Sequence, residues 1–312
     1  MKCYLRKIVI LIIMLLIYLL SVFSSFAAGE AIGSLSTDQL INKLKGGFAQ
    51  LTLAETRKIW IEIFKRGDEA VPVLISEFKA GLGSKDELIK RYRYLFHSLK
   101  LTGASEEARK LLRPYSQDRE INIMSKELCF GLAALADPNC ESKFLLTPGI
   151  TFHRDVAYNL GISRDKRYLP RMEKFAESDL DVRHAIYWIN VGPSPLKQGQ
   201  NDIQRIRQLI FEFMYFGGSG IGPGKETLNI ILKGEETQIF YGSDGRLYSA
   251  LPKEDGYFRI TFEEVNFNNK TRAYTTVDFA GPSAGKTYDF LLEKKQGDWQ
   301  FTAIWVPVEY YE

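Results

Sequence analysis

The stretch that decides the fold of the final third of the chain is Trp299-Gln300-Phe301-Thr302-Ala303-Ile304-Trp305. Apolar residues at 299, 301, 303 and 305 alternate with polar Gln300 and Thr302, which is the two-residue period of a half-buried β-strand. The turn-forming sequence Gln296-Gly297-Asp298 stands directly before it. This arrangement predicts that the strand before the turn and the strand after it form an antiparallel pair.

The residues before this stretch have the periods of further strands and of one helix. The turn at Asn268-Asn269 separates two of the strands. The expected helix covers 203–215, and the expected strands cover 228–232, 238–241, 258–267, 271–279, 287–294 and 299–308. A helix followed by an antiparallel meander predicts an α+β domain at 202–312, with a curved antiparallel sheet around the helix.

The first half of the chain has a different period. Residues 36–191 show helical periodicity that breaks at intervals of roughly 35 to 40 residues, which indicates helical repeats. Residues 192–200 then contain two Pro and two Gly, and the apolar pattern stops. We therefore expect a multidomain chain, with an all-α domain at 36–191 and a linker at 192–201.

The N-terminus has the pattern of an export signal. Lys2, Arg6 and Lys7 precede the apolar run 8–23, and the small residues Ser25 and Ala27 stand where a signal peptidase would need them for cleavage after Ala27. The prediction is a signal peptide at 1–27 and a periplasmic or extracellular protein. The alternative is an uncleaved anchor at 8–28, which is long enough to span a bilayer; the membrane would then be a partner only through this segment.

Charge argues against two classes of partner. The chain has 41 basic and 38 acidic residues, and the excess of three lies entirely in the predicted signal peptide. The remainder is formally neutral, so neither nucleic acid nor an anionic membrane surface is indicated.

Few motifs point to chemistry. Residues 280–287 fit a loose phosphate-loop pattern, but a phosphate loop precedes a helix, whereas 287–294 has the pattern of a strand. His97, His153 and His184 all lie in the helical half, and no nucleophile elbow occurs. We expect no metal site and no cofactor.

Two cysteines of the mature chain stand close together. Cys129 and Cys140 are separated by a turn sequence, and an oxidising compartment permits a disulfide between them. Two buried thiols are the alternative, because cysteine packs well as a small apolar residue.

The helical half resembles HEAT-like repeats. The resemblance rests on first-helix patterns at Gly67-Asp68-Glu69-Ala70-Val71-Pro72-Val73-Leu74-Ile75 and 165–172, and on second-helix patterns at 154–161 and 181–186. It implies a helical solenoid of stacked helix pairs whose groove binds a protein or peptide.

The C-terminal part resembles nuclear transport factor two-like, or cystatin-like cone, domains. The residues that carry the resemblance are 272–279, 286–292 and Lys295-Gln296-Gly297-Asp298-Trp299-Gln300-Phe301. It implies a conical pocket. Arg272, Tyr274 and Asp278 share one strand face and are the candidate ligand-binding residues of that pocket; the alternative is a solvated outer face.

These features together predict an exported, non-enzymatic interaction protein that binds an unknown protein or peptide through its repeats and a small ligand through its C-terminal domain. One competing hypothesis is an enzyme with an acid/Tyr site, which requires Asp278 or Asp289 to point into the pocket beside a tyrosine. Another is a structural envelope component held by its uncleaved anchor.

Overall fold

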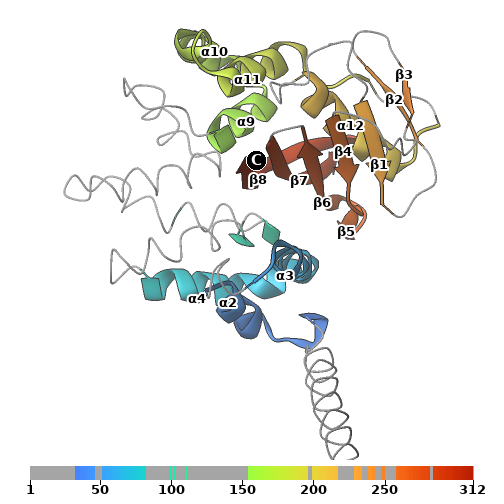
Figure 1. Ribbon diagram of the computed structural model, residues 1–312. Helices are drawn as coiled ribbons and strands as arrows, with labels where there is room; N and C mark the ends of the chain where they lie inside the picture. The colour runs from blue at the N-terminus through green and yellow to red at the C-terminus, as the bar shows by residue number, and fades with distance from the viewer. Residues whose placement is uncertain are drawn as a thin grey trace, which may run out of the picture. The chain divides into compact units, whose positions relative to one another are not determined.

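A computed structural model describes residues 32–45, 51–81, 98–99, 101–102, 110, 154–195, 199–216, 228–233, 238–242, 247–249, 258–281 and 284–311 (Figure 1). Residues 1–62 and 63–312 form two compact units. The predicted signal peptide, Cys129 and Cys140 lie outside the described residues. Within the described ranges, no helix has the length and apolar character needed to cross a membrane.

Helices α2 and α3 are each preceded by a residue whose side chain accepts a hydrogen bond from a backbone amide of the first turn. The short helix η1 (Ile32–Ser34) precedes α2 (Thr37–Lys45) and α3 (Leu53–Arg66). Ser36 and Gln39 form a reciprocal capping box at the start of α2, with the Ser36 amide donating to the Gln39 side chain at 2.7 Å and the Gln39 amide donating to the Ser36 hydroxyl at 3.2 Å. Thr52 and Glu55 do the same for α3. The single turn η2 (Gly67–Ala70) then leads into α4 (Val71–Gly81).

A second group of helices precedes the sheet. It consists of α9 (Arg154–Ser163), η3 (Lys166–Tyr168), α10 (Leu169–Met172), η4 (Glu173–Phe175), α11 (Leu180–Val191) and α12 (Asp202–Phe216). Helices α9 and α11 approach closely at Gly161, where an added Cβ atom would lie 2.9 Å from the Cα atom of Ala185. The missing side chain therefore allows the contact between these two helices.

The strands form a six-stranded sheet and a separate hairpin. The main sheet has the order β1-β4-β6-β7-β8, with β5 beside β6. Its strands are β1 (Leu228–Leu232), β4 (Phe258–Phe262), β5 (Asn266–Asn268), β6 (Arg272–Ala280), β7 (Ala284–Lys295) and β8 (Asp298–Tyr311). β2 (Ile239–Tyr241) pairs with β3 (Leu247–Ser249). β1 and β4 are parallel, and the other pairs are antiparallel.

The core lies on one face of this sheet, which we call the core face and define by Ala273, Val277, Tyr288, Phe290 and Ile304. Helix α12 packs on it through Phe213, whose ring also contacts Tyr158 of α9 at 5.3 Å and Trp188 of α11 at 5.3 Å. Helices α9, α11 and α12 therefore share one hydrophobic core with the sheet. Figure 1 shows α12 beside the strands, and the buried core between this helix and the sheet is rich in aromatic residues.

The expected all-α HEAT-like solenoid is wrong, because the described residues contain no extended stack of helix pairs. Within the described ranges, short helices are present where the periodicity predicts them, and the helices predicted within 82–153 lie mostly outside those ranges. Helix α9, however, packs against β8 and joins the core of the sheet. Helical periodicity identifies an apolar face, and it does not identify the element that covers that face. The described residues show no groove between stacked helix pairs, and binding of a protein or peptide remains a prediction.

The expected purely antiparallel sheet is also wrong, because β1 joins β4 in parallel. The period of two marks a strand, and both pairing directions have it, so the sequence could not decide between them. The other strand predictions are close. β7 and β8 cover their predicted segments, β6 is shifted by one residue from 271–279, and the predicted strand 258–267 is divided into β4 and β5. In the segment 280–287, Ala280 pairs with Gly285 in the antiparallel β6–β7 ladder, and residues 282–283 lie outside the described residues.

Candidate functional site

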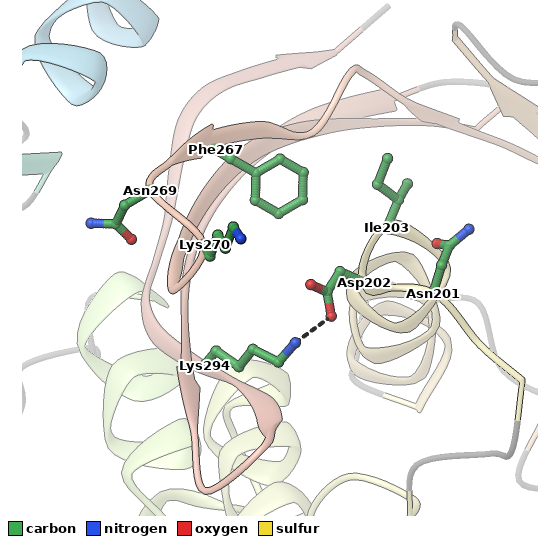
Figure 2. Close-up of a pocket in the computed structure, with 7 residues that line it drawn as sticks. All are labelled: Asn201, Asp202, Ile203, Phe267, Asn269, Lys270 and Lys294. Atoms are coloured by element: carbon green, nitrogen blue, oxygen red, sulfur yellow. Dashed lines mark hydrogen bonds and ion pairs between the residues drawn. The ribbon is translucent and has the colours of Figure 1, made fainter.

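The groove in Figure 2 lies between the first turn of α12 and the β5–β6 turn. It is an open hollow of about 430 Å³. Its lining residues are Asn201, Asp202, Ile203, Phe267, Asn269, Lys270 and Lys294. Together they place one aromatic ring, one aliphatic side chain and a polar rim around a concave surface.

Local capping fixes the α12 side of the groove. Asn201 precedes the helix and accepts a hydrogen bond at its Oδ1 atom from the Gln204 amide at 2.9 Å, while the Asn201 amide donates to the Gln204 side chain at 3.1 Å. Asp202 follows in the first turn, where a negative charge is stabilised by the helix dipole. The capping sequence therefore holds both polar residues at the edge of the groove.

An ion pair crosses the groove from helix to sheet. The Lys294 Nζ atom donates to Asp202 Oδ1 at 2.7 Å, and Lys294 also lies over the Trp299 ring at 5.8 Å from its centroid. The Lys294 ammonium holds the pKa of Asp202 below its usual range. Both charges of this pair are thus already matched, as the dashed line in Figure 2 shows.

The turn from β5 to β6 forms the opposite side. Asn269 adopts a left-handed conformation with φ of 64°, and its Oδ1 atom accepts from the Thr271 amide at 2.8 Å and from the Thr271 hydroxyl at 2.6 Å. Asparagine tolerates this conformation better than most residues, and the two hydrogen bonds hold the turn. The turn places Lys270 on the rim, exposed to solvent and without an ion pair to any described residue.

Phe267 supplies the aromatic surface. It lies opposite Ala273 in the β5–β6 pair, so its side chain points to the core-face side of the sheet. The ring is 36% exposed, and its centroid lies 5.8 Å from that of Trp299. The buried Trp299 thus packs against the partly exposed Phe267 at the edge of the core.

The predicted binding residues Arg272, Tyr274 and Asp278 lie elsewhere, on the opposite face of β6, which we call the second face. Arg272 donates from Nη2 to the Leu101 carbonyl at 2.8 Å and lies over the Phe64 ring at 5.6 Å. Burial lowers the pKa of Arg272, although Glu293 and Asp68 oppose the shift. Tyr274 is fully buried between the rings of Phe64 at 5.7 Å and Trp305 at 6.2 Å. None of the three lines the groove.

The second face also carries two reciprocal Thr–Asp pairs. The Thr276 hydroxyl donates to Asp289 Oδ1 at 2.7 Å, and the Thr287 hydroxyl donates to Asp278 Oδ1 at 2.6 Å. Each pair joins residues that stand directly opposite each other in the β6–β7 register. Asp289 is therefore on the same face as Tyr274 and fully buried, but it lines no part of the groove.

The groove residues themselves were not predicted as a site from the sequence. The turn at Asn268-Asn269 and the helix start near Ile203 were both predicted, but nothing in the sequence places them next to each other. Comparison of the chain with known protein families, curated proteins and solved structures finds no match. The described residues contain no group of His, Cys, Asp and Glu side chains arranged to hold a metal ion.

Proposed function

We propose that this protein is an exported binding protein whose C-terminal domain binds a small organic ligand in the groove between α12 and the β5–β6 turn. The observation that carries the proposal is Phe267, an aromatic ring with about a third of its surface exposed at the floor of a concave, polar-rimmed hollow. Binding sites for small molecules combine an apolar or aromatic surface with a few fixed polar groups, and this groove has both.

The polar groups of the groove favour binding over a chemical step. Asp202 is the carboxylate in the lining, and its ion pair with Lys294 keeps it ionised. A general acid at neutral pH needs a raised carboxyl pKa, and the pKa of Asp202 is shifted in the opposite direction. The groove can therefore hold and orient a ligand with groups that are already ordered.

An acid/Tyr enzyme would have to use the second face. There Asp278 and Asp289 each accept a hydrogen bond from the threonine opposite, and Tyr274 packs between two rings. Asp289 is buried and Asp278 half-buried, and a hydroxyl donor offsets part of the cost of removing such a carboxyl group from water. We therefore assign the Thr–Asp pairs a structural role in the sheet.

The test uses the full purified chain and a small panel of probes measured by ligand-observed NMR. The panel contains phenylacetate, phenylacetamide, phenethylamine, a trimer of galacturonate and a trimer of galactose. At least one probe should bind, and Phe267→Ala should abolish its binding. Leu247→Ala is the matched control, because Leu247 is 65% exposed on β3 and does not line the groove.

Two results would overturn the proposal. One is a panel in which no probe binds the unmodified chain. The other is a probe that binds Phe267→Ala and the unmodified chain with the same affinity, because binding would then take place elsewhere. Thermal unfolding of both variants shows whether they remain folded, and Phe267→Ala should do so because its ring is already partly exposed.

A further inference from the structure

We infer that the groove selects organic acids in which a carboxylate is joined to a flat carbon framework, with the carboxylate next to Lys270 and the framework on Phe267. The inference rests on the proposed function and adds the chemical class of the ligand. It is built from the two lysines of the lining, from the polar atoms that are already used inside the protein, and from the aromatic floor.

The two lysines of the groove differ in what they can offer a ligand. Lys294 is engaged, since its ammonium contacts Asp202 at 2.7 Å and lies over Trp299. Lys270 is exposed on the rim and forms no ion pair within the described part of the chain. The lining therefore carries one net positive charge, located at Lys270. An anionic ligand can neutralise it without breaking an existing contact.

The acceptor atoms of the rim are largely consumed by the protein. Asp202 accepts from Lys294, Asn201 Oδ1 accepts from the Gln204 amide, and Asn269 Oδ1 accepts from Thr271. An ammonium ligand would have to compete with these existing hydrogen bonds, whereas a carboxylate would not, because it brings its own acceptor atoms.

The N-terminal end of α12 adds a positive electrostatic potential to that of Lys270. The N-terminal end of a 15-residue helix carries partial positive charge, and this end borders the groove. Asp202 offsets that charge, but Lys294 in turn neutralises Asp202. The sum at the groove is therefore positive, and it reinforces the preference that Lys270 creates.

The aromatic floor defines the other half of the ligand. A flat carbon surface can lie on the exposed part of the Phe267 ring and exclude water from it. Two kinds of organic acid supply this shape: an aromatic acid, and an acidic sugar whose axial C–H bonds form a flat apolar face. Both present a carboxylate beside a flat carbon surface, which is the chemistry that the groove fits.

The first experiment compares phenylacetate with its neutral amide, phenylacetamide, and with the cationic phenethylamine in NMR titrations of the full chain. Phenylacetate should bind most tightly and phenethylamine least. Lys270→Gln should weaken phenylacetate binding about threefold at low salt, as expected for an exposed charge pair, and leave phenylacetamide unchanged. Lys166→Gln is the control, because Lys166 is an exposed lysine on η3, outside the groove.

A second variant tests whether exposing a carboxylate reverses the charge preference of the groove. Lys294→Gln removes the partner of Asp202, so a carboxylate becomes accessible on the rim. This variant should gain affinity for phenethylamine and lose its preference for phenylacetate. The galacturonate and galactose trimers then distinguish the two sources of acid: tighter binding of the galacturonate trimer than of phenylacetate identifies an acidic sugar, and the reverse identifies an aromatic acid.

The failure of this inference is distinguishable from the failure of the proposed function. If phenylacetate and phenylacetamide bind equally, or if Lys270→Gln has no effect while Phe267→Ala still abolishes binding, the groove is a binding site without preference for acids. If no probe binds at all, both the preference for acids and the proposed binding function are contradicted.

Discussion

His184 lies in an environment very different from that of a free side chain in water. It is buried in α11, with its ring centroid 4.2 Å from that of Phe213 and 5.1 Å from that of Tyr158. Burial lowers the pKa of His184 from 6.5 to about 3. His184, which the sequence placed in the helical half, is therefore a neutral residue packed against the aromatic core.

The pH dependence of stability follows from this shift. Below pH ~6.5 the unfolded chain binds a proton at His184 that the folded chain excludes until pH ~3, so the stability present above pH ~6.5 is lost as the pH falls. We expect the contribution of this group to fall by about 2 kcal/mol between pH ~7 and ~5. Urea unfolding at both pH values measures it. His184→Phe should show a shallower dependence, and an identical slope in both proteins would contradict the assignment.

Asn159 forms hydrogen bonds with the backbone of Ile304, a residue far away in the sequence. Its Nδ2 atom donates to the Ile304 carbonyl at 2.6 Å, and its Oδ1 atom accepts from the Ile304 amide at 3.1 Å. The side-chain amide thus takes the place of a neighbouring strand at the outer edge of β8. This cap satisfies two backbone groups that would otherwise be buried without partners.

Asn159→Leu should lower the free energy of unfolding by about 1–3 kcal/mol, because it leaves the amide and carbonyl of Ile304 without hydrogen-bond partners. Chemical denaturation measures the loss. Asn190→Leu is the control, since Asn190 is exposed on α11, and it should change stability very little. Equal effects of the two substitutions would show that the Asn159 contacts contribute nothing specific.

At the scale of the elements, one ion pair joins α12 to the β7–β8 turn. Arg205 is 1% exposed, and its guanidinium donates from Nε and Nη2 to both carboxylate oxygens of Asp298, each at 2.8 Å. Nη2 also donates to the Ser194 carbonyl at 2.8 Å. Burial acts to raise the pKa of Asp298, but the hydrogen bonds and charge of Arg205 outweigh it, and the pKa of Asp298 lies below its usual value.

Asp298→Asn should destabilise the protein by about 3 kcal/mol, because it leaves a buried guanidinium without a counter-charge. The matched control is Asp165→Asn, which breaks the ion pair between Asp165 and Arg167, an arginine that is 85% exposed. Surface pairs of that kind contribute only about 0–1 kcal/mol. Denaturation midpoints of the two variants decide the question, and a small effect of Asp298→Asn would mean that water replaces the carboxylate.

At the scale of the whole molecule, the predicted linker at 192–201 remains a prediction, and the shared core gives it a consequence. Tyr158 and Trp188, which precede the linker, pack against Phe213, which follows it. Limited proteolysis at 192–200 should therefore give two fragments on a denaturing gel that still elute together in size-exclusion chromatography. Fragments that separate under native conditions would favour two independently folding domains.

The predicted start of the mature chain is also a property of the whole molecule. Cleavage after Ala27 should leave Ala28 as the first residue, because Ser25 and Ala27 are the small residues that a signal peptidase requires. N-terminal sequencing of the native protein tests this. Retention of Met1 together with recovery of the protein in the membrane fraction would instead support the uncleaved anchor.

The local elements of this chain follow from its sequence, whereas the contacts between distant elements do not. Period and turn residues predicted α12, the turn at Asn269 and the strands β6 to β8, because helices, strands and tight turns depend on neighbours within a few residues. The helix α9 was predicted as well, but with the wrong partner. Its apolar face covers the sheet rather than a repeat, and a sequence does not record which surface an apolar face meets.

The candidate site follows the same division. By itself the sequence determined the local parts: the helix that begins near Ile203, the turn at Asn268-Asn269 and the alternating strand that contains Trp299. Only the tertiary structure decided that the start of α12 lies beside the β5–β6 turn, so that Phe267 and Lys270 border one groove. It also placed Arg272, Tyr274 and Asp278 on the second face. The physical reason is that local conformation depends on adjacent residues, whereas a groove depends on packing between segments that are more than sixty residues apart.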